Sequence, residues 1–119
     1  MRKAIKLKRA YDAPGPDDGY RVLVDRLWPR GVAKDAAHID LWLKDIAPST
    51  ELRQWFNHDV ARWSEFRRRY RAEIKEHPEA LAQLMAASRK GPVTLIYGAK
   101  DGEHNNAAAL KEYIDGSRI

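Results

Sequence analysis

Two short apolar runs place the strongest constraint on the fold of this chain. Tyr20-Arg21-Val22-Leu23-Val24 and Val93-Thr94-Leu95-Ile96-Tyr97 are rich in β-branched residues, and each is followed directly by a polar loop. Apolar runs of this length are typical of strands covered on both faces, as in parallel sheets flanked by helices. The two runs therefore predict an α/β fold.

Two further segments are expected to extend this sheet. Ile5 and Leu7 alternate with lysines, and between positions 38 and 45 apolar residues alternate with polar ones at Ile39, Leu41 and Leu43. A period of two residues is the pattern of a half-buried strand. We therefore expect a small, mainly parallel sheet of about four strands flanked by helices. The loop at 12–19 is short for a helical crossover, so the order and direction of strands one and two stay open.

Helical periodicity fills the chain between the third and fourth of these strands. Ser49 and Asp59 are good N-caps, and each precedes apolar residues at helical spacing. The clearest stripe repeats every three or four residues: Trp63, Phe66, Tyr70 and Ile74. It should end just before Pro78, which disfavours helix in the preceding residue. A further stripe covers 81–85, and a last helix is expected after the loop at 98–102.

Length and composition limit the class of protein. A chain of 119 residues with 44% hydrophobic and 33% charged residues fits a single globular domain over 1–119. It has no stretch of ~20 apolar residues that could span a membrane and no signal-peptide core near Met1, so we expect no membrane partner and a cytoplasmic location. The oligomeric state is left open.

The residue inventory excludes several kinds of site. Cysteine is absent, which removes thiol nucleophiles, disulfides and thiolate zinc sites. The four histidines lack metal-ligand spacing, and no glycine-rich phosphate-binding motif is present, so we expect neither a metal nor a cofactor. Lysine and arginine outnumber acids 22 to 17, which permits an anionic ligand or nucleic acid without choosing between them.

The most conspicuous polar stretch leaves the strand at 20–24. In Asp25-Arg26-Leu27-Trp28-Pro29-Arg30-Gly31, three charges stand beside an indole. The guanidinium groups of Arg26 and Arg30 could hold a carboxylate or phosphate, while Asp25 orients them or transfers a proton. The alternative is a structural Asp–Arg pair beneath a packed Trp28.

A second polar set could reach the same place. Lys44 is an anion ligand, an amine nucleophile if burial lowers its pKa, or a solvated lysine. Ser49 is favoured as a helix cap over a nucleophile, and Arg53 lies one turn into the helix that Ser49 begins. His58, beside Asp59, is either a proton shuttle or a loop histidine next to a helix cap.

A third polar set surrounds the start of the last helix. Ligands of open α/β sheets gather beyond the carboxyl ends of the strands, where helix N-termini offer free N–H groups. The candidates there are Tyr97, Lys100, His104, Asn105 and Asn106, with Arg9 at the end of the first strand.

An arginine-rich run offers a different reading. Arg67-Arg68-Arg69-Tyr70-Arg71 resembles a nucleic-acid-binding surface. The aromatic residues of this segment are accounted for by the helical core stripe, so the arginines are expected on a solvated face with Glu65, Glu73 and Glu76 in reach. Nucleic-acid binding through 62–71 is therefore possible but less favoured.

Several motifs in order carry a family resemblance. They are residues 25–31, Trp42-Leu43-Lys44-Asp45, Ala47-Pro48-Ser49, Leu52-Arg53-Gln54-Trp55-Phe56, the segment from Phe66 to Tyr70, Leu95-Ile96-Tyr97 and His104-Asn105-Asn106-Ala107. Together they resemble the YeaO-like family of uncharacterised proteins, a domain-of-unknown-function family. The resemblance implies an α/β fold and a shared polar pocket. It also suggests a wider group with a Cys-His-Arg helix start where this chain has His104-Asn105-Asn106, so thiol chemistry at that position does not carry over.

These observations lead to one preferred function and two alternatives. The polar sets are expected to meet in a cleft that binds, and could transform, a small anionic molecule, with Asp25 or His58 as acid or base. Whether the chain is an enzyme stays open. The alternatives are a basic accessory protein that contacts nucleic acid, and a protein-interaction module with Trp28 or Trp55 as exposed anchors.

Overall fold

The fold is a four-stranded parallel sheet covered mainly by helices. A computed structural model describes residues 5–116, and its strands are β1 (Ile5–Arg9), β2 (Tyr20–Leu23), β3 (Leu41–Trp42) and β4 (Val93–Tyr97). They lie in the order β1-β4-β2-β3, and all three pairings are parallel. This confirms the predicted α/β class with a mainly parallel sheet.

The central strand resolves how the first two strands are arranged. β4 pairs with β1 through Ile5–Val93 and with β2 through Tyr20–Val93, so β1 and β2 run in the same direction on either side of β4 without pairing with each other. The loop between them passes the start of β4 without a helix, and the Thr94 hydroxyl donates a hydrogen bond to the Asp18 carbonyl at 2.7 Å. A short crossover suffices because it spans one intervening strand.

The third strand is shorter than its alternating sequence predicted. Only Leu41 and Trp42 continue the sheet beside β2, where they pair with Val22 and Leu23. His38 caps the short helix α1 (Lys34–Ala37) in the left-handed region, with φ 51°, and the chain turns into the 3-10 helix η1 (Lys44–Ile46) directly after Leu43. Both turns interrupt the extended backbone that a strand over 38–45 would need.

The helices agree closely with the expected signals. They are α2 (Thr50–Phe56), the 3-10 turn η2 (Val60–Arg62), α3 (Trp63–Lys75), α4 (Pro78–Lys90) and α5 (Asn106–Gly116). The Ser49 hydroxyl accepts the Leu52 N–H at 3.1 Å, and an Asp59 carboxylate oxygen accepts the Ala61 N–H at 3.0 Å. Pro78 begins α4 as its first residue, where the missing N–H costs nothing.

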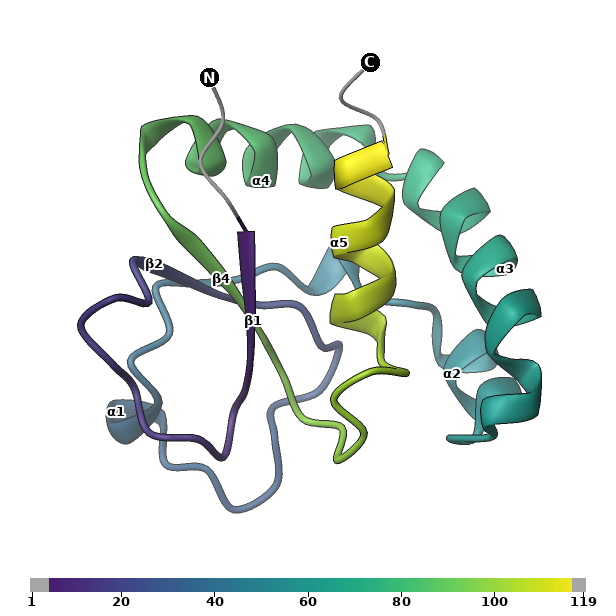
Figure 1. Ribbon diagram of the computed structural model, residues 1–119, viewed down its shortest axis with the longest axis horizontal. Coiled ribbons are helices and arrows are strands. Elements are labelled where there is room, and N and C mark those ends of the chain that lie inside the picture. The colour runs from purple at the N-terminus through teal and green to yellow at the C-terminus, as the bar shows by residue number, and fades with distance from the viewer. Residues whose placement is uncertain (1–4, 117–119) are drawn as a thin grey trace.

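Each face of the sheet has its own apolar layer. Figure 1 shows α3, α4 and α5 gathered together, with α1 apart from them. The main core joins these helices and α2 to Val22, Val24 and Leu95, whereas Leu23 and Ile96 face a smaller cluster. Trp28, Val32, Ile39 and Trp42 cover that smaller cluster. β2 and β4 are therefore covered on both faces, as their apolar composition predicts.

The Trp28 and Trp42 indoles fix the loop that leaves β2. Their rings meet edge to face with centroids 5.4 Å apart, and each indole N–H donates to a backbone carbonyl at 2.7 Å, Trp28 to Val32 and Trp42 to Asp25. Even half-buried indoles usually find such partners. The Trp42 indole therefore holds the backbone of Asp25 where the loop leaves β2.

Among residues 5–116, no helix is long and apolar enough to cross a membrane.

Candidate functional site

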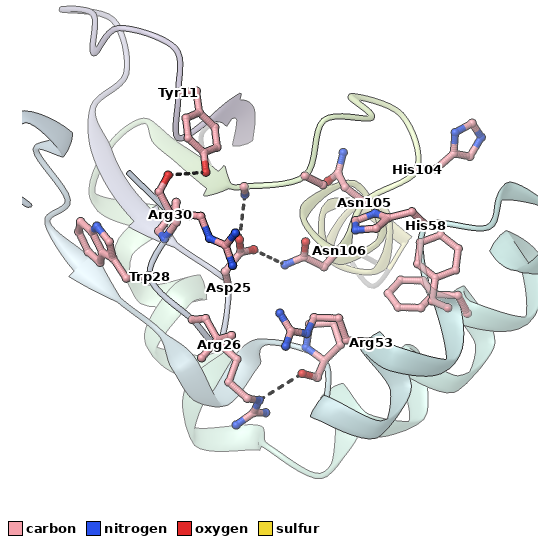
Figure 2. Close-up of a pocket in the computed structure, with 17 residues that line it drawn as sticks. Tyr11, Asp25, Arg26, Trp28, Arg30, Arg53, His58, His104, Asn105 and Asn106 are labelled. Carbon is pink, nitrogen blue, oxygen red and sulfur yellow. Dashed lines mark hydrogen bonds between the residues drawn. The ribbon is translucent and has the colours of Figure 1, made fainter. Parts of the chain in front are cut away.

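A cleft of about 440 Å³ opens beyond the carboxyl ends of the strands. Its walls come from the loop after β2, the loop after β4, and the segments around α2 and α5, as Figure 2 shows. Most of the polar residues singled out in the sequence line it: Asp25, Arg26, Trp28, Arg30, Arg53, His58, His104, Asn105 and Asn106. This is the edge of an open α/β sheet at which ligands commonly bind.

The Asp25 carboxylate is held in place by two donors. Oδ2 accepts the Gly98 N–H at 2.8 Å, and Oδ1 accepts the Asn106 side-chain amide at 3.0 Å. The same amide nitrogen donates to the Val24 carbonyl at 2.9 Å. Burial raises the pKa of Asp25, although both hydrogen bonds and the nearby charge of Arg53 oppose that rise. Asp25 therefore joins the exits of β2 and β4 to the first residue of α5.

The three arginines of the cleft differ in what they contact. Arg26 donates to the carbonyls of Ala47 and Pro48 at 3.2 and 3.3 Å, which ties its loop to the chain ahead of α2. Within residues 5–116, the guanidinium groups of Arg30 and Arg53 make no hydrogen bond or ion pair. Both side chains are solvent exposed and line the cleft. Two positive groups are therefore available to a ligand (Figure 2).

Two of the predicted polar residues are engaged in building the turn before α5. Asn105 caps the helix, accepting the Ala108 N–H at 2.8 Å and donating to the Asp101 carbonyl at 2.9 Å. The His104 ring lies 2.9 Å from an Asp101 carboxylate oxygen and packs edge-on against Trp63. Hydrogen bonds from the Glu103 N–H and from His104 hold the pKa of Asp101 below its usual value.

His58 reaches the cleft from an unusual backbone. Asn57 and His58 both occupy the left-handed region, with φ 47° and 55°. Asn57 ends α2 in this way, and His58 extends the reversal toward η2. Residues without a glycine's freedom adopt this conformation rarely, and histidine and asparagine do so more readily than most. The exposed His58 side chain lines the cleft as a result.

Five predicted residues do not line the cleft: Arg9, Lys44, Ser49, Tyr97 and Lys100. Arg9 donates to the Ala99 carbonyl at 2.9 Å, and the Lys44 ammonium lies 4.0 Å from the Trp42 ring centroid. Tyr97 is buried, and this burial raises the pKa of its hydroxyl. Lys100 is exposed. A strand-end position identifies the edge of the sheet, but it does not say into which layer the side chain points.

Ser49 has a structural partner instead. Its hydroxyl donates to one Glu73 carboxylate oxygen at 2.6 Å, and its backbone N–H donates to the other at 2.7 Å. Together with its cap on Leu52, Ser49 therefore links the start of α2 to the last turns of α3.

Replacing Ser49 with alanine is expected to lower the free energy of unfolding by about 1–2 kcal/mol, because the helix cap and one hydrogen bond of Glu73 are lost. Urea denaturation measures the change. Ser64→Ala, at an exposed position of α3, is the matched control and should change the value by less than about 0.5 kcal/mol. Equal effects of the two substitutions would show that neither the cap nor the hydroxyl contact with Glu73 contributes to stability.

Comparison with known proteins assigns the family. Residues 4–117 match the family model described as the inactive DUF488-N3 subclade. The chain belongs to the DUF488 family. It is 44% identical over 110 residues to the uncharacterized protein YeaO of Escherichia coli, which covers 92% of this chain and 96% of that protein. It is 39% identical over 112 residues to the uncharacterized protein Rv3073c of Mycobacterium tuberculosis, covering 94% of each. No solved structure matches it.

Family membership confirms the resemblance based on the motifs. The cleft of this DUF488-N3 chain also uses parts that the motifs did not indicate. Gly98 contributes a backbone N–H, a group that almost every residue type has and that the sequence therefore does not single out. A Cβ at this position would lie 3.1 Å from Asp25 Oδ2. Phe56 and Phe66 belong to the core and also line the cleft, beside Pro29. The glycine directly after β4 is the one sequence signal that could have pointed to this close approach.

The arginine run of this DUF488-N3 chain is largely paired with acids. Arg68 and Arg69 both contact Glu65, whereas Arg67 and Arg71 lie against Glu112 of α5. Of the three acids expected in reach, Glu65, Glu73 and Glu76, only Glu65 pairs with these arginines among the described residues, and Glu73 contacts Ser49 instead. The Trp55 ring is half-buried, with the guanidinium carbon of Arg69 4.1 Å from its centroid.

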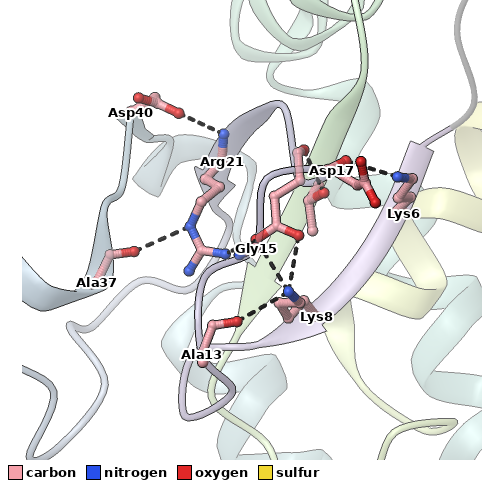
Figure 3. A network of polar contacts seen from close by, with 10 residues as sticks. Lys6, Lys8, Ala13, Gly15, Asp17, Arg21, Ala37 and Asp40 are labelled. Atoms are coloured by element: carbon pink, nitrogen blue, oxygen red, sulfur yellow. Dashed lines mark hydrogen bonds and ion pairs between the residues drawn. The ribbon is translucent and has the colours of Figure 1, made fainter.

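A second polar network lies at the opposite end of β2 (Figure 3). Asp18 is buried and contacts Arg21 at 2.5 Å and Lys8 at 2.9 Å, while the Gly15 N–H donates to it at 3.0 Å. Burial of Asp18 would raise its pKa, but these hydrogen bonds outweigh that effect and lower the pKa from 3.8 to about 2. Arg21, only 4% exposed, also donates to the Ala37 carbonyl. The network fixes the loop between β1 and β2.

Proposed function

We propose that this DUF488-N3 chain binds a small anionic molecule in the cleft. The observation that carries the proposal is the pair of guanidinium groups, Arg30 and Arg53, that line one cleft without a hydrogen-bonding partner in residues 5–116. Guanidinium groups stay charged at any physiological pH and match carboxylate or phosphate in a bidentate geometry. An anion between them would meet two positive charges at the mouth of one cleft.

Three features favour binding over catalysis. The subclade whose model matches this chain is described as inactive. Two residues of the helix start, His104 and Asn105, are taken up by contacts with Asp101 and Ala108. The chain contains no cysteine for covalent chemistry. A general acid or base role for Asp25 or His58 stays a prediction, as does the cytoplasmic location.

The proposal predicts that Arg53→Gln weakens anion binding by tenfold or more. A hydrogen bond to a charged group contributes about 1.5–3 kcal/mol, which corresponds to at least a factor of ten in affinity. The measurement is thermal unfolding of the wild type and the variant across a panel of anionic metabolites. A ligand at ten times its Kd raises the free energy of unfolding by about 1.4 kcal/mol.

Arg89→Gln is the matched control for this measurement. It removes the same charge from an exposed position near the end of α4, outside the cleft. Ligands that stabilise the wild type should stabilise Arg89→Gln to the same degree. At ten times the wild-type Kd they should stabilise Arg53→Gln by only about 0.4 kcal/mol or less. Equal loss in both variants would mean that net charge, and not the cleft, attracts the anion.

The nucleic-acid alternative rests on the arginines of α3. Their ion pairs with Glu65 and Glu112 reduce the positive charge that they offer to a phosphate backbone. If nucleic acid were the partner, affinity would fall steeply with rising salt because phosphate neutralisation releases counterions. Binding of short duplexes and single strands at low salt, measured by fluorescence anisotropy, tests this alternative directly.

The protein-interaction alternative requires an exposed indole. Trp28 and Trp55 are both half-buried, the first against Trp42 and the second beneath Arg69. Interface anchors are usually aromatic side chains free to enter a pocket of the partner. These contacts leave the anion-binding cleft as the better supported proposal.

A further inference from the structure

The floor of the cleft offers hydrogen-bond acceptors beside the two arginines. Each carboxylate oxygen can accept two hydrogen bonds, and in Asp25 each accepts one, from Gly98 and from Asn106. The Asn106 amide nitrogen donates to both Val24 and Asp25, which fixes the direction of its carbonyl oxygen. That oxygen accepts no hydrogen bond within residues 5–116. The unused acceptor capacity therefore lies in the same cleft as the cationic groups.

The charges around Asp25 leave room for a cation from the ligand. Arg53 on α2 is near enough to lower the pKa of Asp25, yet it forms no ion pair with it. Burial and the negative charge of Asp25 raise the pKa of Tyr70 on α3. The Tyr70 hydroxyl donates to the Ile46 carbonyl and not to Asp25. Arg30, His58 and His104 also line the cleft but make no hydrogen bond to Asp25 in the described chain. An anionic ligand without a hydrogen-bond donor would bring its negative charge toward the Asp25 carboxylate with nothing on the ligand to offset the repulsion.

We propose that the ligand of this cleft is a zwitterion with a carboxylate and a nearby primary ammonium group, such as an amino acid. The carboxylate pairs with Arg30 and Arg53, and the ammonium donates to Asp25 and to the free carbonyl oxygen of Asn106. This inference rests on the anion-binding function proposed above. The apolar surface of Phe56, Phe66 and Pro29 accommodates a nonpolar side chain.

Three probes that share one apolar body test this inference. L-phenylalanine carries both charges, 3-phenylpropionate carries only the carboxylate, and 2-phenylethylamine carries only the ammonium. Titration of the full chain at neutral pH, followed by two-dimensional NMR, reports binding through the Gly98 amide, which is hydrogen-bonded to Asp25. L-phenylalanine is expected to bind at least tenfold more tightly than either of the other probes.

The Asp25→Asn variant should remove this preference. The affinity for L-phenylalanine is expected to fall to that for 3-phenylpropionate, whose own affinity should stay equal or increase because a negative charge has been removed. The dispersion of the amide spectrum verifies that the variant folds. If it does not fold, the comparison of the three probes on the wild-type chain decides the question.

The outcomes separate this inference from the function on which it rests. If 3-phenylpropionate binds as tightly as L-phenylalanine, the ammonium contact is refuted and anion binding stands. If none of the three probes binds while phosphate or another simple anion does so in an Arg53-dependent way, the zwitterion is again refuted alone. If no anion shifts the Gly98 amide or any other cleft signal, both proposals fall.

Discussion

Replacing Gly19 with alanine is expected to lower the free energy of unfolding by about 3 kcal/mol or more. Gly19 has φ +65°, and a Cβ there would lie 2.3 Å from the Pro92 carbonyl oxygen. The same carbonyl oxygen accepts a hydrogen bond from the Tyr20 N–H at 2.9 Å, where β2 joins β4. A left-handed alanine is strained by itself, and the contact with the carbonyl forces the two strands apart. Urea denaturation measures the loss.

Two other glycines separate the contributions to this effect. Gly31 has φ +79° with open space around a Cβ, so Gly31→Ala should show the conformational cost alone, about 1–2 kcal/mol. Gly91 is extended and equally uncrowded, and Gly91→Ala should change stability by less than about 0.5 kcal/mol. If Gly19→Ala cost no more than Gly31→Ala, the close approach of Gly19 and Pro92 would be disproved.

Replacing Asp18 with asparagine is expected to cost about 3 kcal/mol at neutral pH. The substitution keeps the shape but leaves the buried Arg21 guanidinium without its counter-charge, and removing one member of a buried ion pair is strongly destabilising. Asp17→Asn is the control, because it removes the same charge from an exposed side chain one residue away. That variant should unfold within about 0.5 kcal/mol of the wild type.

Acid should abolish the difference between the wild type and Asp18→Asn. The pKa of Asp18 is 3.8 in its ordinary state and about 2 in the fold, so the ionised carboxylate stabilises the fold fully above pH 3.8. As the pH falls toward about 2, Asp18 takes up a proton and the wild type loses this contribution. Urea denaturation at several pH values should show the two proteins converging between about pH 4 and 2. A difference that persisted unchanged at pH 2 would contradict this account.

Local signals predicted the helices and the buried strands because their causes are local. Ser49 and Asp59 act as caps through their own side chains, and Pro78 fixes where α4 begins. The apolar runs of β2 and β4 are buried on both faces, and composition reveals this directly. β3 is different, because a strand of two residues exists only where Leu41 and Trp42 meet β2.

The position of the cleft could be predicted from the sequence, but not every residue that forms it. Asp25 and Asn106 follow from the rule that sites lie at the carboxyl ends of parallel strands. Asn105 and Asn106 are indistinguishable in sequence, yet the first caps α5 and the second holds Asp25. The contact made by the Gly98 N–H involves a backbone group, so the residue type does not predict it. Periodicity alone does not give the rotation that separates such neighbours.

The ion pair of Asp18 and Arg21 also could not be predicted from the sequence. Both residues were assigned by their segments, Asp18 to a polar loop and Arg21 to a strand. Their burial depends on how the loop between β1 and β2 crosses the start of β4, where the Thr94 hydroxyl binds the Asp18 carbonyl. That path is fixed only when β4, far along the chain, has taken its place between the first two strands.

The most direct test of anion binding is the position of an anion in a crystal. Selenate is a tetrahedral oxyanion whose anomalous scattering identifies it without ambiguity, and crystals of the full chain can be soaked in it at neutral pH. A selenate ion is expected in the cleft, with oxygens about 3 Å from the guanidinium nitrogens of both Arg30 and Arg53. Selenate bound only to arginines outside the cleft, with Arg30 and Arg53 unoccupied, would contradict it.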